Sequence, residues 1–314
     1  MTTAVLATAY GGPEVLRLVD VDVPAPGPGD VTIEVRAAGV NPIDVKVYSG
    51  RLGDDPARLP MRLGFEVSGV VTATGPAATG SDGTVSVGDE VIASTDGGYA
   101  GAVTVPASAV VPKPPRLSFE EAAGLLLVGG TAYHLLAATG VAAHDTVLVH
   151  GAAGGVGRAA AQLASLRGAT VVGTASPRHH DQLRGLGVVP VEYGPGLADR
   201  VRAVAPEGVD VALDTVGTDE AVDVSLELVA DRRRIATIAA FGRAPDAGIQ
   251  LLGGGPGADP GTEVRERSRL VLTDLAGRGE LQVVVAAVLP LAEVAQAHRL
   301  VGSGHAGGKV VLVP

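Results

Sequence analysis

The sequence predicts an α/β protein of two domains, one built on a doubly wound parallel sheet and the other a β-barrel-like module. Short strand-like segments with turn signals fill roughly the first hundred residues, strands and helices alternate further on, and a glycine-rich turn joins one apolar strand to a helix. A chain of 314 residues has the length for two domains. Its 46% apolar and only 3% aromatic residues predict a core of Ala, Val and Leu, as in parallel sheets covered by helices.

The first part of the chain reads as a series of short strands. The segment 24–30 is rich in Pro and Gly and predicts a rigid connector. Further on, Ser118 with Glu121 three residues later predicts the start of a helix that runs through 122–127. The expected strands are 5–9, 15–19, 31–37, 64–74, 90–94 and 101–105.

From residue 131 onward, strands are separated by helical segments of a length that implies parallel pairing. The C-terminal segments resemble the N-terminal ones, so we expect the tail to return and complete the β module. We therefore assign residues 1–117 and 281–314 to the β module and residues 118–280 to the parallel-sheet domain. The expected strands are 146–150, 170–174, 188–192, 209–214, 234–239, 281–287 and 309–313, and the expected helices are 131–139, 158–166, 197–205, 220–228, 263–276 and 291–301.

The most informative segment is a turn in which Gly154, Gly155, Val156 and Gly157 follow an apolar strand and open a helix. A helix N-terminus offers N–H groups and the positive end of the helix dipole, and glycines let a pyrophosphate approach the backbone. The pattern departs from G-x-G-x-x-G because Ala152 stands at the first glycine position. We predict a dinucleotide site here; the alternative is a tight turn that needs no ligand.

The end of the next strand predicts which dinucleotide binds. An NAD site normally carries Asp or Glu there, which accepts a hydrogen bond from the ribose 2′-hydroxyl. Residues 174–180 contain no carboxylate, whereas Ser176 can donate to a phosphate and Arg178 can pair with one bidentately. The segment therefore favours NADPH over NADH; the alternative is a solvated loop without a ligand.

Composition excludes several classes of function. The formal net charge of −10 argues against nucleic acid or an anionic membrane as partner, because phosphates would be repelled. The chain has no Cys, which excludes disulfides, Cys-ligated zinc and thiolate catalysis. The seven His, among them His305, lack the spacing of a metal site. Without a signal-peptide pattern or an apolar run approaching a membrane span, we expect a soluble, cytoplasmic protein.

Eight different short motifs are spread over nearly the whole chain, at 39–44, 64–71, 97–100, 117–123, 130–133, 152–157, 214–217 and 307–312. With these motifs the chain resembles the medium-chain dehydrogenase/reductase superfamily, in the zinc-independent quinone oxidoreductase branch that includes ζ-crystallin. The resemblance implies a Rossmann-type domain, a GroES-like β-barrel domain and a homodimer. Zinc-dependent relatives place a ligating His where this chain has Phe65, so the resemblance implies hydride transfer without a metal.

The same resemblance implies a set of residues that bind NADPH. Tyr193 would help Ser176 and Arg178 around the 2′-phosphate, and Lys309 would contribute from the C-terminal part. For the residues at the ends of the later strands, ordinary core packing is the alternative. The implied coenzyme-binding residues are Thr131, Gly154, Gly155, Val156, Gly157, Ser176, Arg178, Tyr193, Val216, Ala240, Phe241, Gly242 and Lys309.

The catalytic residues implied by the resemblance are Asn41, Asp44, Lys46 and Tyr48, on a loop that would lie at the substrate cleft. Asn41 would hydrogen-bond a substrate or ribose oxygen, and Lys46 or Tyr48 would stabilise the oxyanion of an enolate or quinol. The alternative is structural. Asp44 would cap the next helical turn, Asn41 would satisfy the turn before Pro42, and Lys46 would be solvated.

We expect an NADPH-dependent, zinc-independent oxidoreductase that reduces quinones or α,β-unsaturated carbonyls by hydride transfer, with a small conjugated molecule as its partner. One alternative is an enoyl-thioester reductase or a biosynthetic ene-reductase, although Leu52 stands where enoyl-thioester reductases have a proton-donating Tyr. Another alternative is a non-catalytic NADPH-binding protein.

Overall fold

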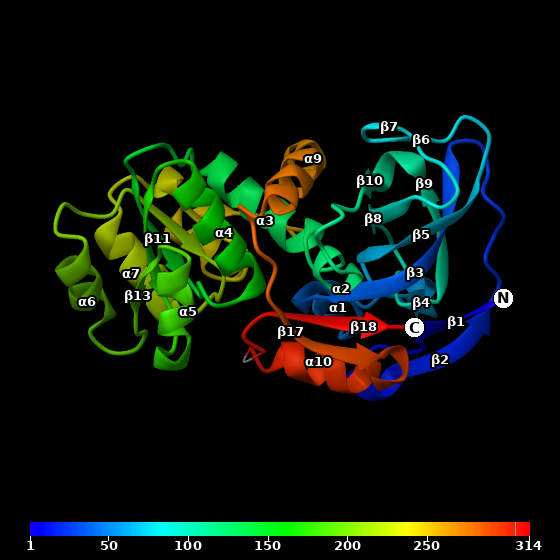
Figure 1. Cartoon of the computed structure of the whole chain (residues 1–314). Coiled ribbons are helices and arrows are strands. Elements are labelled where there is room, and N and C mark those ends of the chain that lie inside the picture. The colour runs from blue at the N-terminus through cyan, green and yellow to red at the C-terminus, as the bar shows by residue number, and fades with distance from the viewer. Residues whose placement is uncertain (305) are drawn as a thin grey trace. The chain divides into compact units, whose positions relative to one another are not determined.

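The computed structural model describes residues 1–304 and 306–314, so His305 lies outside the described residues (Figure 1). The chain forms two compact units. The first unit contains residues 1–127, 269–279 and 283–314, and the second contains 128–268 and 280–282. The predicted bounds between the two domains were 117/118 and 280/281. In the structure, residues 118–127 and 269–279 belong to the first unit, and residues 281–282 belong to the second.

The difference in bounds has a local cause. The Ser68 hydroxyl donates to the carbonyl of Phe119 over 2.5 Å, which ties the segment after Ser118 to the first unit. In the same unit, Nη1 of Arg269 donates to the carbonyl of Ser108 over 3.2 Å. The periodicity of apolar residues does not predict side-chain contacts of this kind. It predicts where a helix begins and ends, but not which unit each half of the helix packs against.

The first unit is built on β-sheet, as predicted. In its described part, a seven-stranded sheet has the order β10-β8-β5-β3-β18-β17, with β9 also paired to β3. The C-terminal strand pairs with β3 in antiparallel register, Val311 opposite Gly39, so the predicted return of the tail is confirmed. In Figure 1 the red β18 accordingly lies beside the blue β3. The strands are β3 (Asp30–Val40), β5 (Glu66–Thr74), β8 (Glu90–Ser94), β9 (Ala102–Pro106), β10 (Val110–Pro112), β17 (Val285–Pro290) and β18 (Lys309–Val313).

Smaller elements complete this unit. The helix start at Ser118 is confirmed, because the Ser118 hydroxyl accepts from the Glu121 N–H over 3.1 Å and the Glu121 carboxylate accepts from the Ser118 N–H over 2.9 Å. This capping box begins a short helix that is followed by a longer one. The elements are β1 (Thr2–Ala7), β2 (Leu16–Val21), β4 (Met61–Arg62), β6 (Thr79–Gly80), β7 (Gly83–Thr84), α1 (Pro42–Tyr48), α2 (Phe119–Ala122) and α10 (Val294–Gly302).

Helix α1 corrects the prediction of a loop at this position. Its N-cap is Asn41, Pro42 stands in its first turn, and the carboxylate of Asp44 accepts the Asn41 N–H over 2.7 Å. Proline fixes a helical φ at the first position without losing a needed donor, so the turn is well started. The helix was missed because Ile43, Val45 and Val47 alternate as they would in a strand.

The second unit confirms the predicted parallel sheet. Within residues 128–268 the structure forms a six-stranded sheet in the order β13-β12-β11-β14-β15-β16, with every pair parallel. The chain leaves β11 for one side of the sheet and later returns beside it to build the other side, which is the doubly wound arrangement. The strands are β11 (Thr146–His150), β12 (Thr170–Thr174), β13 (Val189–Val191), β14 (Val211–Asp214), β15 (Ile235–Thr237) and β16 (Gln250–Leu251).

The predicted helices 131–139, 158–166, 197–205, 220–228 and 263–276 are present, but the first two begin several residues earlier than predicted. Helix α4 begins at Gly155, three residues earlier than the predicted Arg158, so Val156 and Gly157 lie inside it. Helices α5 and α8 and strand β16 were not predicted. The helices are α3 (Leu126–Ala138), α4 (Gly155–Leu166), α5 (His180–Gly185), α6 (Leu197–Val204), α7 (Asp219–Leu228), α8 (Ala244–Ala247) and α9 (Thr262–Arg278).

One segment contradicts the expectation that no apolar run approaches the length of a membrane span. The helical segment Phe119–Ala138 has 20 residues and a mean hydropathy of 1.2, long and apolar enough to cross a membrane. However, 72% of the 18-residue window that meets this criterion is buried inside the protein. A helix that is apolar all round and buried by its own chain is also typical of a protein core.

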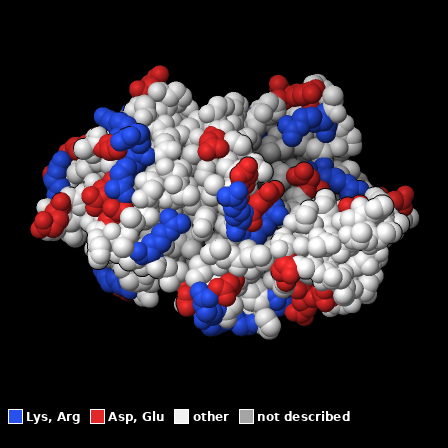
Figure 2. Space-filling model, turned by 90° about the horizontal axis from the view of Figure 1, so that it is seen from above, with Lys and Arg blue, Asp and Glu red and all other residues white. Residues whose placement is uncertain are grey.

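Charged side chains of both signs are interspersed on the face drawn in Figure 2. In the second unit, several arginines pair with carboxylates. Arg243 contacts Asp219 and Asp223 at 2.5 and 2.6 Å, and Arg184 contacts Asp181 at 2.6 Å. Exposed pairs of this kind add little stability, but each carboxylate neutralises a cation locally.

Candidate functional site

The carboxyl ends of the parallel strands gather most of the predicted coenzyme residues. Because all strands of this sheet run the same way, the loops that follow them meet at one edge of the second unit. Ligands of doubly wound sheets bind at this edge, where the strand order reverses. The predicted residues that follow these strand ends are Gly154, Gly155, Val156 and Gly157 after β11, Ser176 and Arg178 after β12, Tyr193 after β13, Val216 after β14, and Ala240, Phe241 and Gly242 after β15.

The turn after β11 requires its glycines. Gly151 has a φ of +76°, and a Cβ there would lie 2.5 Å from Val216 Cγ1. A Cβ on Gly157 would lie 2.2 Å from the carbonyl oxygen of Gly151. The N-cap of the twelve-residue α4 is Gly154, which has no side chain to accept from the first N–H groups of the helix. The turn therefore fits a pyrophosphate.

Ala152 is accommodated because of where its side chain packs. Its N–H donates to the carbonyl of Thr174 over 3.0 Å, which turns the residue toward β12. Opposite it, a Cβ on Gly173 would lie 2.6 Å from the Cβ of Ala152. The missing first glycine of the motif is thus compensated by a glycine in the neighbouring strand.

The ends of β14 and β15 are organised by two buried side chains that sequence reasoning missed. The Asp214 carboxylate accepts the N–H groups of Val216 and Gly217, both over 2.9 Å, and the Thr237 hydroxyl over 2.6 Å. The Thr237 hydroxyl in turn accepts the Ala240 N–H over 2.9 Å. There were two sequence signals, an Asp at the end of an apolar strand and the motif at 214–217, and neither revealed the hydrogen bonds. This pair fixes both loops at the edge.

The side chains on these loops differ in exposure. Val216 is 47% exposed, so it is open to a ligand. Ala240 is buried in the core of the second unit, as the packing alternative expected. Phe241 is half-buried and packs on Gly255, where a Cβ would lie 2.1 Å from its ring. Gly242 is exposed and has open space around it.

The ends of β12 and β13 present polar side chains to solvent. Tyr193 is 54% exposed, and Arg178 is also exposed. Nε of Arg178 donates to Nε2 of His179 over 3.1 Å. The Thr174 hydroxyl accepts the Gly151 N–H over 3.1 Å, which ties the end of β12 to the glycine turn. The structure therefore brings Arg178 and Tyr193 to adjacent strand ends, beside this turn.

The backbone around Tyr193 is held by one arginine. The Arg200 guanidinium donates to the carbonyls of Glu192, Gly194 and Pro195 over 2.9, 2.7 and 2.8 Å. Tyr193 thus stands on a fixed loop.

Thr131 lies on α3 and is buried in the second unit. Its hydroxyl accepts from Nη1 of Arg265 over 3.0 Å, and burial lowers the pKa of that arginine. Sequence reasoning missed Arg265, which stands in the first turn of α9 among several other charged residues.

Lys309, the remaining predicted coenzyme residue, belongs to the first unit and is held in a buried cluster. Its Nζ lies 2.7 Å from Oε1 of Glu66 and donates to Oδ1 of Asn41 over 2.6 Å. Nδ2 of Asn41 donates to the same Glu66 oxygen over 3.1 Å, and the Leu127 N–H donates to the other over 2.9 Å. All three side chains of the cluster are at most 4% exposed. We call Lys309, Glu66 and Asn41 the buried triad.

The triad needs a glycine on β3. A Cβ on Gly39 would lie 2.5 Å from Oε1 of Glu66 and 2.3 Å from the carbonyl of Ala123. Glu66 was not predicted as a site residue. It stands directly after Phe65, and no sequence signal revealed that its partner is 243 residues away.

A second buried group continues from Asn41 through helix α1. The Asp44 carboxylate accepts the N–H groups of Asn41 and Gly64 over 2.7 and 3.2 Å and is hydrogen-bonded to Tyr99. Nε2 of His298 lies 3.3 Å from the Tyr99 hydroxyl, and Nδ1 lies 3.0 Å from that of Tyr48. Burial raises the pKa of Asp44 to about 7 and that of Tyr48 to about 12, and lowers that of His298 to about 4.

Three of the four predicted catalytic residues are therefore in the interior of the first unit. Asn41 and Asp44 start helix α1, as the structural alternative expected, and Tyr48 is fully buried against His298. Lys46 is half-buried at the surface of the same helix. Burial lowers the pKa of its ammonium, and the charge of Arg51 lowers it further.

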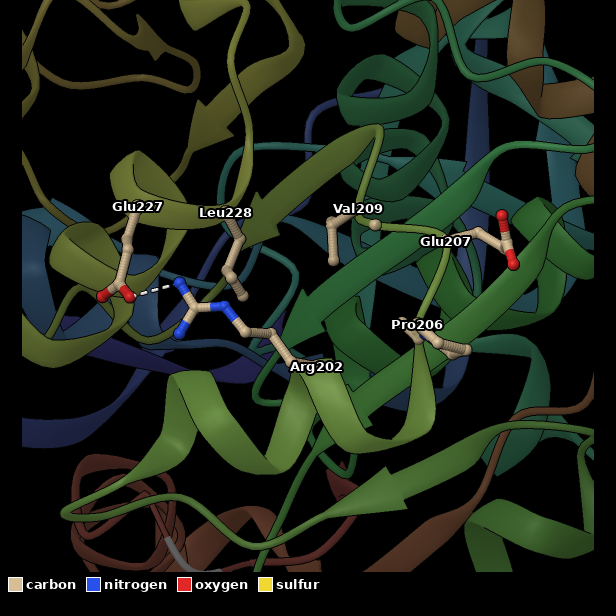
Figure 3. Close-up of a pocket in the computed structure, with 8 residues that line it drawn as sticks. Arg202, Pro206, Glu207, Val209, Glu227 and Leu228 are labelled. Atoms are coloured by element: carbon tan, nitrogen blue, oxygen red, sulfur yellow. Dashed lines mark hydrogen bonds and ion pairs between the residues drawn. The ribbon is translucent and has the colours of Figure 1, made fainter.

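A shallow depression in the second unit lies elsewhere (Figure 3). Arg202 and Glu227 close one side of it with an ion pair of 2.5 Å. The segment 205–209 on its other side precedes β14, which places the depression at the amino edge of the sheet. It therefore takes no part in the strand-end site.

Comparison with known proteins agrees with this architecture. Residues 27–115 match the family model described as alcohol dehydrogenase GroES-like domain, and residues 190–312 match the one described as zinc-binding dehydrogenase. Human quinone oxidoreductase is 31% identical, over 99% of this chain and 97% of that protein. A mycobacterial protein solved in complex with NADPH is 34% identical, with a TM-score of 0.85 over 100% of both chains.

The human synaptic vesicle membrane protein VAT-1 homolog-like is 36% identical over 219 residues. These residues are 69% of this chain and 51% of that protein, so the chain spans about half the length of this relative.

The fold and the strand-end loops define a Rossmann-type protein that also carries a GroES-like domain. The chain belongs to the medium-chain dehydrogenase/reductase superfamily, in its quinone oxidoreductase-like branch, as its motifs predicted.

The buried His298 and Asp44 give opposite pH dependences of stability. The pKa of His298 is about 4 in the folded state and has its ordinary value in the unfolded state. As pH falls from about 6.5 to 4, the unfolded state takes up the proton first, so the contribution of His298 to the free energy of unfolding falls by about 3 kcal/mol. A carboxyl with a pKa of about 7 contributes stability at low pH that is lost as pH rises from about 4 to 7.

We therefore predict that the stability advantage of the parent over His298→Gln shrinks between about pH 7 and pH 4.5. The advantage over Asp44→Asn grows over the same range. Urea unfolding of the three proteins at both pH values measures these differences, from which other titrating groups cancel. Differences that do not change with pH would contradict the assignment.

Proposed function

We propose that this protein is an NADPH-dependent, zinc-independent oxidoreductase that reduces quinones or α,β-unsaturated carbonyls. The observation that carries the proposal is the pair of adjacent strand ends in the second unit. The end of β11 carries a glycine turn in which a Cβ would clash with neighbouring atoms. The end of β12 carries Ser176 and Arg178, with no carboxylate between 174 and 180. The relatives support it, since one is a quinone oxidoreductase and one binds NADPH.

The donor set supports independence from zinc. The chain has no Cys, and Phe65 stands where zinc-dependent relatives have a ligating His. Across residues 1–304 and 306–314, no group of three or more His, Asp or Glu side chains is arranged to hold a metal ion. Zinc-assisted oxidation of an alcohol needs a metal to acidify the hydroxyl, so an acceptor that is already electron-poor suits this chain better.

Each part of the strand-end site has a distinct task. The N–H groups at the start of α4 would hold the pyrophosphate, and Ser176, Arg178 and Tyr193 would surround the 2′-phosphate. The exposed Val216, on a loop fixed by Asp214, would border the nicotinamide. When bound, NADPH supplies a hydride to the conjugated acceptor.

Water, Tyr48 and Lys46 are the candidate proton sources, and of the two side chains Lys46 is the better candidate. The Tyr48 hydroxyl is buried against His298, and its pKa of about 12 disfavours proton donation near neutral pH. The ammonium of Lys46 is only half-buried, and its pKa is lowered. It can therefore stabilise an enolate oxygen and donate a proton to it.

The proposal is tested by stopped-flow mixing of NADPH-loaded protein with 1,4-benzoquinone, 9,10-phenanthrenequinone and 2-cyclohexenone. We expect the absorbance of the reduced nicotinamide to fall with at least one acceptor. If NADPH binds tightly and no acceptor oxidises it, the protein only binds the coenzyme.

Arg178→Ala should weaken NADPH binding and leave NADH binding nearly unchanged. Loss of a charge-assisted phosphate contact costs on the order of 1 to 3 kcal/mol. Arg184→Ala is the matched control, because Arg184 is a nearby exposed arginine already paired with Asp181. Fluorescence titration of the three proteins measures both affinities. Equal affinity of the parent for NADPH and NADH would refute the assignment.

Lys46→Met should slow reduction of 2-cyclohexenone by about 10²-fold or more, as removal of a general acid does. Reduction of phenanthrenequinone should change much less, because a quinol anion is stable enough to take its proton from water. The ratio of the two rates separates loss of the proton donor from general damage. A parallel fall in both rates would assign Lys46 a structural role.

A further inference from the structure

His179 is next to Arg178 and close to Ser176, the residues proposed to contact the 2′-phosphate. The proposed function gives His179 itself no role. We propose that His179 determines coenzyme specificity by taking up a proton when the 2′-phosphate binds, so that the preference for NADPH over NADH strengthens as pH falls. This inference rests on the proposed binding of NADPH.

The hydrogen bonds show the state of the imidazole without coenzyme. Nε of Arg178 donates to Nε2 of His179, and a guanidinium can only donate. Nε2 must therefore present its lone pair, which makes His179 neutral in this arrangement. The imidazole thus orients Arg178 without neutralising its charge.

The contacts continue from His179 to the glycine turn. The imidazole is hydrogen-bonded to Gln182, whose Oε1 accepts from Nη2 of Arg158 over 3.3 Å. Nη2 of the same arginine donates to the carbonyl of Ala153 over 3.3 Å. One connected group of side chains therefore joins the candidate 2′-phosphate position to the candidate pyrophosphate position.

The charges that face His179 are cationic. They come from Arg178 on the same turn, from His180 next to it, and from Arg158 on α4. The nearest acid in sequence, Asp181, is exposed and paired with Arg184. Burial lowers the pKa of His179, these charges lower it further, and only the hydrogen bond to Gln182 opposes them. Without coenzyme the residue is poised to stay neutral at pH 7.

A 2′-phosphate reverses this balance. It carries a charge of about −1.5 to −2, and an opposite charge at close range favours the protonated form of a histidine. Arg178 can turn its Nε to the phosphate, and a proton from solvent then occupies Nε2 of His179. The phosphate gains a second cation, and no other bond changes. NADH has no 2′-phosphate, so its binding does not favour the protonated form of His179.

Proton uptake on binding makes affinity depend on pH. For each proton taken up, affinity rises by at most about tenfold per unit fall in pH. The phosphate itself has a pKa near 6 and takes up protons in the free coenzyme, which opposes the effect at lower pH. A comparison of variants with the parent, at or above about pH 6.5, removes that contribution.

The test is isothermal titration calorimetry of NADPH and NADH into the parent, His179→Asn and His179→Gln. Two buffers of different ionisation enthalpy at about pH 7 report the protons taken up. His144→Asn is the matched control, since His144 is an exposed histidine with a φ of +71°, a conformation that Asn tolerates.

We expect the parent and His144→Asn to take up about half a proton or more with NADPH, relative to both His179 variants. With NADH, all four proteins should take up the same amount. Equal uptake of NADPH-linked protons by parent and His179 variants would overturn the inference, even if affinity falls. If the folded parent does not bind NADPH at all, the proposed function itself fails, which is a separate result.

Discussion

The close approach of α4 to the turn after β11 is the constraint on which the candidate coenzyme site depends. The Gly157 Cα lies so near the carbonyl of Gly151 that a Cβ would be 2.2 Å from that oxygen. This contact seats the first turn of the helix on the strand end, so its N–H groups face the same edge as the neighbouring strand ends. Gly173 gives Ala152 its space by the same means, from the next strand. Backbone proximity, more than any single polar side chain, defines where a phosphate can be held.

The first unit follows a different rule, because its organising contacts are polar and buried. An ammonium removed from water is tolerated when it has close hydrogen-bonding partners, and Lys309 has both Glu66 and Asn41 within 2.7 Å. Removing one partner of such a pair leaves an uncompensated buried charge, which costs more than the pair itself contributes. The triad therefore fixes β18, β5 and the start of α1 against one another, and Asp44 extends this order along the helix. Asn41 and Asp44, which the motifs predicted to be catalytic, therefore also hold the first unit together.

Local patterns in the sequence were sufficient for five of the six strands of the parallel sheet and insufficient for the buried network. Strands β11 and β12 begin and end where predicted, because each has consecutive Val or Leu residues at its centre and turn residues beyond its ends. Helix α1 was missed because its apolar residues alternate, and α5 because it is only six residues long and opens with polar and charged residues. The partner of Asn41 in the triad is 268 residues away, a distance over which periodicity carries no information. Glycine spacing predicted the coenzyme turn since its physical requirement is local.

The pairing of arginines in the second unit, with carboxylates or with a neutral histidine, explains how an acidic chain can attract a phosphate. With a net charge of −10, the protein as a whole repels anions, and Arg184, Arg202 and Arg243 are each paired with carboxylates. Arg178 instead donates to the neutral His179, so its charge is oriented but not cancelled. A carboxylate in place of the imidazole would orient the guanidinium equally well and would compete with the phosphate for it. A histidine avoids that competition and, once protonated, adds to the attraction, so selectivity for a phosphorylated ribose can arise from a single neutral acceptor beside one arginine.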